Sequence, residues 1–230
     1  MTEQPASEIL VSVCYPTRGR IENLKRCIDS VLSTVTKPER IEHVLRVDND
    51  DQETLDALKE IVPSIHTRGS TIKVLSGPRI PGDFARAFAA MFTECCNHAK
   101  GRWIFQLSSD CGVMPESNGW DDDLAQVVQE KVLVSPGANL YRGQRYTWKL
   151  ENHAWHTAHF LIMENHWWRK FGLADCPYPV DTMTLNLLTG AGWRGVRHHA
   201  WTLHILDRLV TFHNQVEDQQ FKERGRLGFD

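Results

Sequence analysis

Short apolar runs alternate with amphipathic segments along the first 135 residues of the chain. The runs, each of the length of one β-strand, lie at residues 9–15, 42–47, 71–75, 103–107 and 132–135. Between them, apolar residues recur at helical spacing at residues 21–32, 51–61 and 83–99, and a further helix is expected at 118–130. This alternation predicts an α/β fold of the Rossmann type, with a mixed, mostly parallel sheet flanked by helices.

The pattern weakens after Gly137. Strands are expected at 159–163 and 195–206, helices at 164–171 and 179–188, and a charged, helical segment at 215–226. Proline 63 is expected to end the helix that begins at Asp51, because proline has no backbone N–H to donate. Without an internal repeat or a low-complexity linker, we expect residues 1–230 to form a single domain.

Polar residues gather where three of the predicted strands end. They are Pro16, Thr17 and Arg18 after the first strand, Asp48 and Asp50 after the second, and Ser108, Ser109 and Asp110 after the fourth. In parallel α/β sheets, ligands bind outside the carboxyl ends of the strands. The sequence therefore predicts that these residues share one binding site.

Composition narrows the classes of protein that the chain can belong to. A net charge of −3 gives no overall attraction to nucleic acid or to an anionic membrane. No apolar run approaches the ~18–20 residues that span a bilayer, and the first residues lack the features of a signal peptide. We therefore expect a cytoplasmic protein whose six cysteines are free and mostly buried.

The strand-end motifs resemble the nucleotide-sugar-binding half of a family 2 glycosyltransferase of GT-A fold. Members show a Pro-Thr-x-x-Arg turn, an Asp cluster and an Asp-x-Asp motif in this order, often followed by a Gly-Trp pair such as Gly119-Trp120. Asp181 and His204 are similar in position to later residues of the family. The resemblance covers Ile9 to Asp207, and the compact form also resembles phage-encoded members, which implies the cytoplasm of bacteria or of a phage-infected host. It implies a nucleotide-sugar-binding half at 9–135, an acceptor-binding half at 136–207 and a tail at 208–230.

The resemblance implies a role for each of these side chains. Asp110 and His204 would hold Mn²⁺ or Mg²⁺, which neutralises the diphosphate leaving group. Asp48 would accept a hydrogen bond from the base, and Thr17 and Arg18 would lie against the nucleotide. Asp181 would be the general base that deprotonates the acceptor hydroxyl. The implied reaction moves a sugar from a nucleotide diphosphate donor, here expected to be UDP-linked, to a hydroxyl, with inversion.

The acceptor and the oligomeric state stay open. A glycan, a protein side chain or a hydroxymethylated DNA base fits as acceptor, although the acidic net charge disfavours DNA. An uncovered edge strand would allow a homodimer.

One departure from the family pattern leaves other functions possible for this chain. Ser108 stands where the first carboxylate of Asp-x-Asp is usual, so a degenerate protein that binds a nucleotide sugar without transferring it is one alternative. A nucleotidyltransferase is another, although the turn at 16–20 is short for one. Asp48 and Asp181 also suit helix caps, and His204 suits a half-buried strand position.

Overall fold

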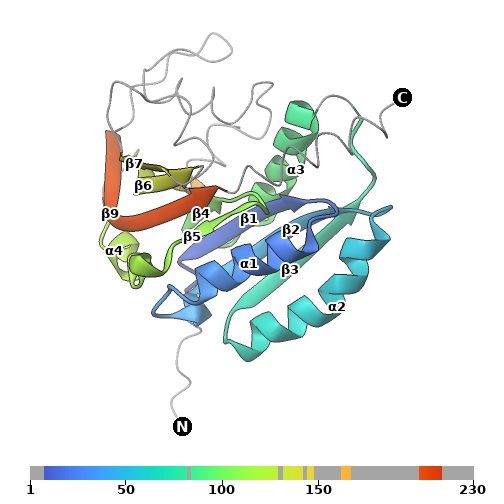
Figure 1. Ribbon diagram of the computed structural model, residues 1–230, viewed down its shortest axis with the longest axis horizontal. Coiled ribbons are helices and arrows are strands. Elements are labelled where there is room, and N and C mark those ends of the chain that lie inside the picture. Colours follow the sequence, from blue (N-terminus) through green and yellow to red (C-terminus); the bar gives the residue numbers. More distant parts are fainter. Residues whose placement is uncertain are drawn as a thin grey trace.

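A computed structural model gives the structure of the protein and describes residues 8–81, 84–128, 132–141, 144–147, 162–166 and 202–213. Their strands form one nine-stranded sheet in the order β3-β2-β1-β4-β8-β6-β9-β5, with β7 paired to β6 (Figure 1). The strands are β1 (Val11–Thr17), β2 (Ile41–Asp48), β3 (Thr71–Gly77), β4 (Trp103–Gln106), β5 (Cys111–Val113), β6 (Val132–Tyr141), β7 (Gln144–Thr147), β8 (Ile162–Glu164) and β9 (Thr202–His213). The α/β fold with a mixed sheet flanked by helices is confirmed.

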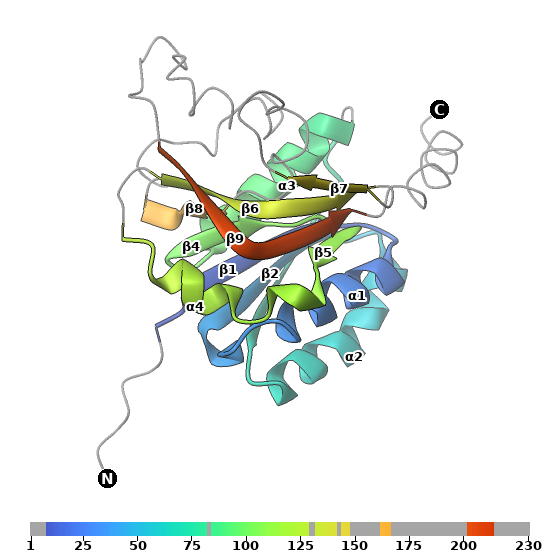
Figure 2. The same cartoon turned by 60° about the vertical axis from the view of Figure 1, so that its left-hand side comes forward.

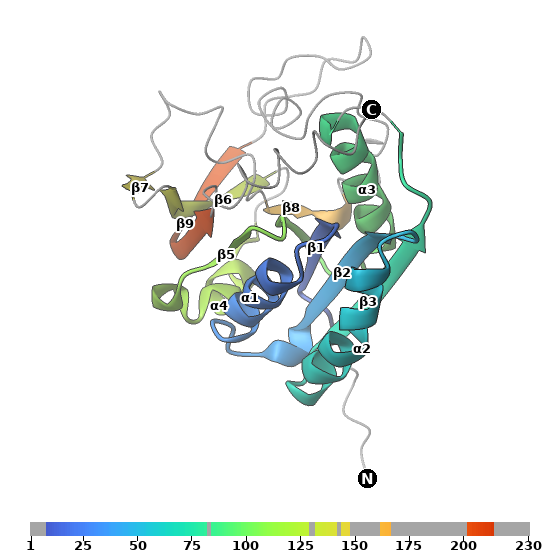
Figure 3. The same ribbon diagram turned by 45° about the vertical axis from the view of Figure 1, so that its right-hand side comes forward.

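The first half of the chain forms a parallel unit whose strand order reverses. Strands β3, β2, β1 and β4 are parallel neighbours. Helices α1 (Ile21–Leu32) and α2 (Gln52–Thr67) cover one face of these strands, and α3 (Phe84–His98) covers the other (Figures 2 and 3). Right-handed crossovers require this change of face when the chain passes from β3 to the far side of β1. The carboxyl ends of β1 and β4 therefore flank the switch point where α/β sheets bind ligands.

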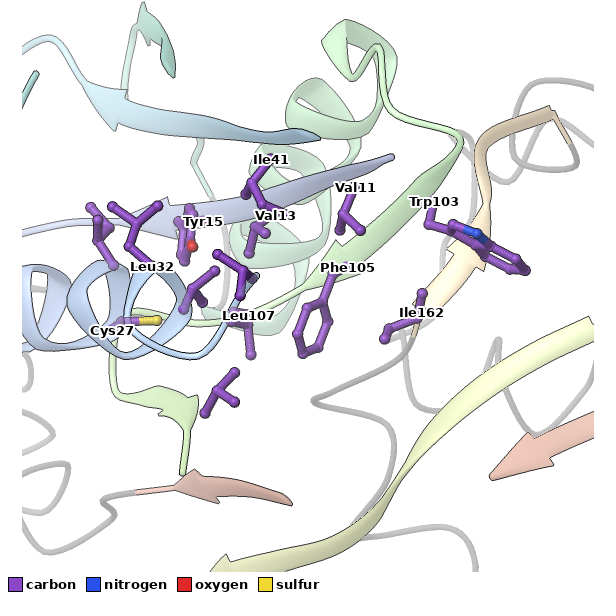
Figure 4. Close-up of a cluster of buried hydrophobic side chains, with 14 of the residues drawn as sticks. Val11, Val13, Tyr15, Cys27, Leu32, Ile41, Trp103, Phe105, Leu107 and Ile162 are labelled. Carbon is purple, nitrogen blue, oxygen red and sulfur yellow. The ribbon is translucent and has the colours of Figure 1, made fainter. Parts of the chain in front are cut away.

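The core explains why the parallel strands form as the sequence predicts. Every residue of β1 and β2 is buried, as expected for strands that are covered on both faces. Figure 4 shows Tyr15 and Leu107 beside Cys27 and Leu32 of α1, and Phe105 of β4 beside Ile162 of β8. The cysteines within the described residues are free and buried, as expected.

The second half of the sheet is longer than the pattern predicts. Strand β6 continues from Val132 to Tyr141, although only 132–135 was expected to be extended, and it returns through β7. Strand β9 continues to His213, beyond residue 206 where an extended segment was expected to end and beyond 208 where the tail was expected to begin. These two strands pair in parallel with a register shift between Pro136 and Ala138. Hydrogen bonds between the strands set the length of β6 and β9, and such pairing produces no periodic pattern in the sequence.

Two helices differ from their predicted bounds. Helix α2 passes through Pro63 and ends at Thr67, because Ile65, beyond the proline, is buried in the core and stabilises the last turn. Helix α4 covers Trp120–Ala125, whereas a helix was expected at 118–130, of which 129 and 130 lie outside the described residues. Its start, Gly119, has a φ of 86°, and the buried Trp120 donates from Nε1 to Thr34 Oγ1 at 3.2 Å. No helix among the described residues is both long and apolar enough to cross a lipid bilayer.

Candidate functional site

The turn after β1 is fixed at its centre and carries an arginine on either side. Gly19 has a φ of 60°, which a glycine adopts without strain. Its N–H donates to Asp51 Oδ2 at 2.8 Å and to Thr54 Oγ1 at 3.1 Å. Asp51 also caps α2 by accepting from the Thr54 N–H at 3.3 Å, so the turn is tied to the start of that helix. Arg18 and Arg20 leave this anchored turn toward two different acidic residues.

Arg18 joins a group of charged residues at the end of β2, which we call the β2-end cluster (Arg18, Arg46, Asp48 and Asp50). Arg18 Nη1 lies 2.9 Å from Asp48 Oδ2 and 2.6 Å from Asp50 Oδ1. Hydrogen bonds to Asp50, and then to Asp48, raise the pKa of the Arg18 guanidinium, and Arg18 in turn lowers the pKa of Asp50. The cluster is partly open to solvent, since the side chain of Asp50 is 51% exposed and that of Asp48 is 4% exposed.

Arg46 holds Asp48 from the buried side of the same cluster. Its Nη1 donates to Asp48 Oδ1 at 3.2 Å, and its Nη2 donates to the Pro78 carbonyl at 2.8 Å. Its Nε donates to Glu94 of α3. A Cβ at position 77 would lie 2.9 Å from Nη2, so Gly77 gives the guanidinium its space. Asp48 is therefore oriented by two arginines, one buried and one near the surface.

Arg20 reaches the loop after β4, where it joins the β4-end cluster (Arg20, Ser108, Asp110 and His213). Arg20 Nη1 lies 2.9 Å and His213 Nε2 lies 3.4 Å from the same oxygen, Asp110 Oδ2. The Ser108 hydroxyl donates to the other oxygen, Oδ1. Burial raises the pKa of Asp110, but His213, Ser108 and Arg20 outweigh it and hold the pKa well below its ordinary value. Asp110 is therefore an ionised carboxylate in a largely buried setting.

Strand pairing places His213 in this cluster. Strand β5 begins directly after Asp110 and runs antiparallel to β9, with Cys111 opposite His213. The last residue of β9 thereby lies next to the loop that carries Ser108 and Asp110. Ser109, between them, is also buried.

Two buried polar atoms lie near the carboxyl ends of β1 and β4. Thr17 Oγ1 at the end of β1 and Gln106 Oε1 at the end of β4 have no hydrogen-bond partner among the described residues. Buried polar groups are usually satisfied, so Thr17, whose strand ends at the switch point, is a residue to which a ligand can supply a hydrogen bond.

The structure brings five of the ten predicted site residues into these two clusters. Arg18, Asp48 and Asp50 meet at the end of β2, and Ser108 meets Asp110 after β4. Thr17 ends β1 between them, and Pro16 lies opposite Arg46 in the register of β1 and β2. The helix cap at the start of α2 is Asp51 and not Asp48.

Of the two remaining candidates for chemistry, the structure describes His204 but not Asp181. His204 is half-buried near the start of β9, opposite Val134, and lies nine positions before His213, about 30 Å along an extended strand. Among the described residues, the potential metal ligands grouped around Asp110 include His213 but not His204. Asp181 lies outside the described residues.

Sequence reasoning missed Arg20, Arg46 and His213 as site residues. Arg20 had a signal, because it is the arginine of the Pro-Thr-x-x-Arg turn. Arg46 had a weaker one, as a charged residue between the apolar Leu45 and Val47 of a predicted strand. His213 had none, since its place depends on pairing between strands distant in sequence.

The donor set at Asp110 fits a divalent cation. Asp110, Cys111 and His213 each offer one ligand atom, all within 4.8 Å of one another. A carboxylate suits Mn²⁺ or Mg²⁺, and an imidazole beside it favours a transition metal such as Mn²⁺. Burial raises the pKa of the Cys111 thiol well above its ordinary value, which keeps the sulfur protonated and a poor ligand. Asp110 and His213 are thus the two residues here that would hold the ion, with its other positions left to water and ligand oxygens.

Comparison with known proteins identifies relatives of this fold. The sequence profile described as Glycosyl transferase family 2 matches residues 12–177. No curated protein matches the sequence significantly. Among solved structures, a mannosyltransferase from Pyrobaculum calidifontis in complex with GDP-Man and Mn²⁺ superposes with a TM-score of 0.61 and 11% identity, over 92% of this chain and 60% of that one.

Two further solved structures are similar to the same extent. TarS 1–349 of S. aureus gives a TM-score of 0.59 at 13% identity, over 91% of this chain and 62% of that one. GalNAc-T7 with UDP, GalNAc and Mn²⁺ gives 0.60 at 14% identity, over 91% and 44%. The chain therefore spans less than two thirds of each of these proteins, and at such identities the likeness shows the GT-A fold.

Proposed function

Since the chain belongs to glycosyl transferase family 2, we propose that it transfers a sugar from a nucleotide diphosphate donor to an acceptor hydroxyl with inversion. The observation that carries this proposal is the pair of clusters at one switch point, joined by the turn after β1. One cluster is partly open and centred on Asp48, and the other is buried and centred on Asp110. Such a pair suits a ligand with a neutral base at one end and a concentrated negative charge at the other.

The β2-end cluster would bind the base of the donor. The Asp48 carboxylate, fixed by Arg18 and Arg46, would accept an N–H from the base edge. We propose uracil as that base, since an imide N–H suits a single carboxylate. TarS in complex with UDP-GlcNAc supports this choice, whereas the mannosyltransferase complex with GDP-Man supports guanine as the alternative.

The β4-end cluster would receive the diphosphate. Asp110 and His213 would hold Mn²⁺, or Mg²⁺, and the bound ion would neutralise charge that develops on the leaving diphosphate. Thr17, at the end of β1 between the two clusters, would form a hydrogen bond with the donor. Two structural neighbours contain Mn²⁺, which supports this assignment.

The acceptor side rests on sequence alone. Asp181 is the proposed general base, and a glycan, a protein side chain or a hydroxymethylated DNA base is the proposed acceptor class. A cytoplasmic location and a homodimer stay predictions. Strand β3, at one end of the described sheet, is the edge through which two copies would pair.

A non-catalytic nucleotide-sugar-binding protein is the second candidate function. It is favoured by Ser108, which adds no charge, and by the pairing of Arg20 with Asp110, which cancels the charge of the carboxylate. Both proposals share the donor site and differ in turnover. Release of UDP from a UDP-sugar, with Asp181→Ala as the inactive comparison, separates them.

Calorimetry with UDP, GDP, CDP and their sugar conjugates, with and without Mn²⁺, tests the donor site. We expect one nucleotide to bind in a metal-dependent manner and Asp110→Asn to lose that dependence. Asp56→Asn is the matched control, because Asp56 is an exposed aspartate of α2 that pairs only locally, with Lys59 and Gln52. Absence of binding by every nucleotide, with folded protein, would refute the donor site.

A further inference from the structure

Arg20 and a divalent ion would have to share one carboxylate oxygen. Arg20 Nη1 and His213 Nε2 both approach Asp110 Oδ2, at 2.9 Å and 3.4 Å. Oδ1 already accepts from the Ser108 hydroxyl and lies 3.6 Å from Cys111 Sγ. Both oxygens of Asp110 therefore have protein partners, and an ion ligated by Asp110 and His213 meets the guanidinium directly.

Charge makes this encounter unfavourable for an ion that arrives alone. The side chains of Arg20, Asp110 and His213 are 13%, 6% and 9% exposed, so solvent screens their charges weakly. Mn²⁺ at ligand distance from Oδ2, about 2.2 Å, would lie within roughly 5 Å of the guanidinium. In addition, Ser108 supplies no second negative charge, so Arg20 cancels the single charge of Asp110.

A bound diphosphate would offset the repulsion between the ion and the Arg20 guanidinium. Its oxygens carry enough negative charge to hold both cations, and a guanidinium matches phosphate oxygens well. The backbone of Arg20 is fixed, because Gly19 N–H is bound to Asp51 and Thr54, and the Arg20 carbonyl accepts from the Leu24 N–H at 2.9 Å. The side chain can thus change partner while the turn and α1 stay in place.

We propose that Arg20 is a diphosphate-binding residue that exchanges its contact with Asp110 for the donor diphosphate, so that metal and nucleotide bind as a coupled pair. This inference rests on the proposed function. Arg20 then disfavours binding of an ion without nucleotide. The Pro-Thr-x-x-Arg turn of this chain thereby controls when the ion binds. The resulting ion affinity is low without nucleotide and high with it.

Titration of free Mn²⁺, followed by its electron paramagnetic resonance signal, tests the coupling on the folded protein without turnover. We expect Arg20→Gln to bind Mn²⁺ alone roughly tenfold more tightly than the unaltered protein does, because the competing charge is gone. Arg20→Lys keeps the charge and should bind Mn²⁺ as weakly as the unaltered protein. Arg68→Gln is the control, since Arg68 forms an arginine–aspartate pair with Asp29 elsewhere on the surface.

The same variants should respond to nucleotide in the opposite direction. With Mn²⁺ present, Arg20→Gln should bind UDP roughly tenfold more weakly, Arg20→Lys should lose less, and affinity for uridine should not change. The double variant Arg20→Gln/Asp110→Asn should lose the gained Mn²⁺ affinity, which would place the ion at Asp110.

Two results would overturn the inference and leave the proposed function standing. One is equal Mn²⁺ affinity of Arg20→Gln and the unaltered protein, and the other is unchanged UDP affinity in Arg20→Gln. If that variant does not fold, tighter binding of Mn²⁺ alone by Arg20→Lys overturns it as well. Failure of the unaltered protein to bind UDP at all, with or without Mn²⁺, instead overturns the proposed function together with the inference.

Discussion

The β2-end and β4-end clusters are both arginine–aspartate groups reached from one turn, but the pairs that Arg18 and Arg20 of this turn form with Asp50 and Asp110 differ in burial. At the end of β2, the side chains of Arg18 and Asp50 are 35% and 51% exposed. At the end of β4, those of Arg20 and Asp110 are 13% and 6% exposed. Exposed pairs contribute little free energy and exchange partners easily, whereas breaking a buried pair leaves a poorly solvated charge. The first cluster is thus suited to hydrogen bonds from a neutral base, and the second to a highly charged group.

If burial decides the strength of these pairs, Arg46 should behave unlike Arg18 within the same cluster. Arg46 is 1% exposed and bonds to Asp48, Glu94 and two carbonyls. We expect Arg46→Met to lower the free energy of unfolding by about 3 kcal/mol and Arg18→Met by about 0.5 kcal/mol. Urea denaturation of both variants measures the difference. Equal losses would mean that burial does not separate these arginines.

The next largest effect should fall on the β4-end cluster. Asp110→Asn removes the carboxylate that the ion and Arg20 share, so we expect Mn²⁺-dependent affinity for UDP to fall about 100-fold, or about 2.7 kcal/mol. Uridine, which has no diphosphate, should bind as before. Calorimetry with both ligands measures this. A matching loss of uridine affinity would show that the two clusters do not bind separate parts of the donor.

A smaller effect is expected at the β2-end cluster. Asp48→Asn keeps the shape of the side chain but replaces one acceptor oxygen with a donor, so we expect uridine and UDP to lose affinity by the same factor of about ten. The loss should not depend on Mn²⁺. Glu22→Gln, an exposed acid of α1, serves as the control. A loss confined to UDP would contradict the assignment of Asp48 to the base.

The smallest expected effect is on thermal stability in acid, compared between the unaltered protein and Asp110→Asn. The pKa of Asp110 is held below its ordinary value, so its ionised form stabilises the fold above the unfolded pKa near 4, and that contribution is lost as pH falls toward the folded pKa. Between pH 5 and pH 2.5, the Tm of the unaltered protein should therefore fall by a few °C more than that of Asp110→Asn. Asp50→Asn, at a position where half of the side chain is exposed, should show a smaller difference. A steeper acid loss in Asp110→Asn would contradict the lowered pKa.

The sequence predicted the parallel half of the fold and the residues that gather at its edge. Short, largely apolar runs for β1 and β4 and the strand pattern of β2 placed Arg18, Asp48 and Asp110 at strand ends, and the geometry of parallel strands brought them together. Helix α1 was predicted with its observed bounds because its apolar stripe and the flanking turn agree. Their binding roles stay predictions.

The rest depended on contacts that a local pattern does not contain. His213 enters the site only because β9 continues past residue 206 and pairs with β5. Pro63 was expected to end α2, but burial of Ile65 stabilises a further turn beyond it. Arg46 lies in a buried strand and is tolerated because Asp48, Glu94 and nearby carbonyls satisfy its guanidinium. In each case, a tertiary partner outweighs a local preference.

A crystal structure of the protein with UDP and Mn²⁺ tests the central claim, that one nucleotide diphosphate spans both clusters, most directly. We predict the uracil edge at Asp48, the ion between Asp110 and His213, and Arg20 on a phosphate oxygen. A nucleotide bound away from the carboxyl ends of β1, β2 and β4, or an ion held without Asp110, would contradict it.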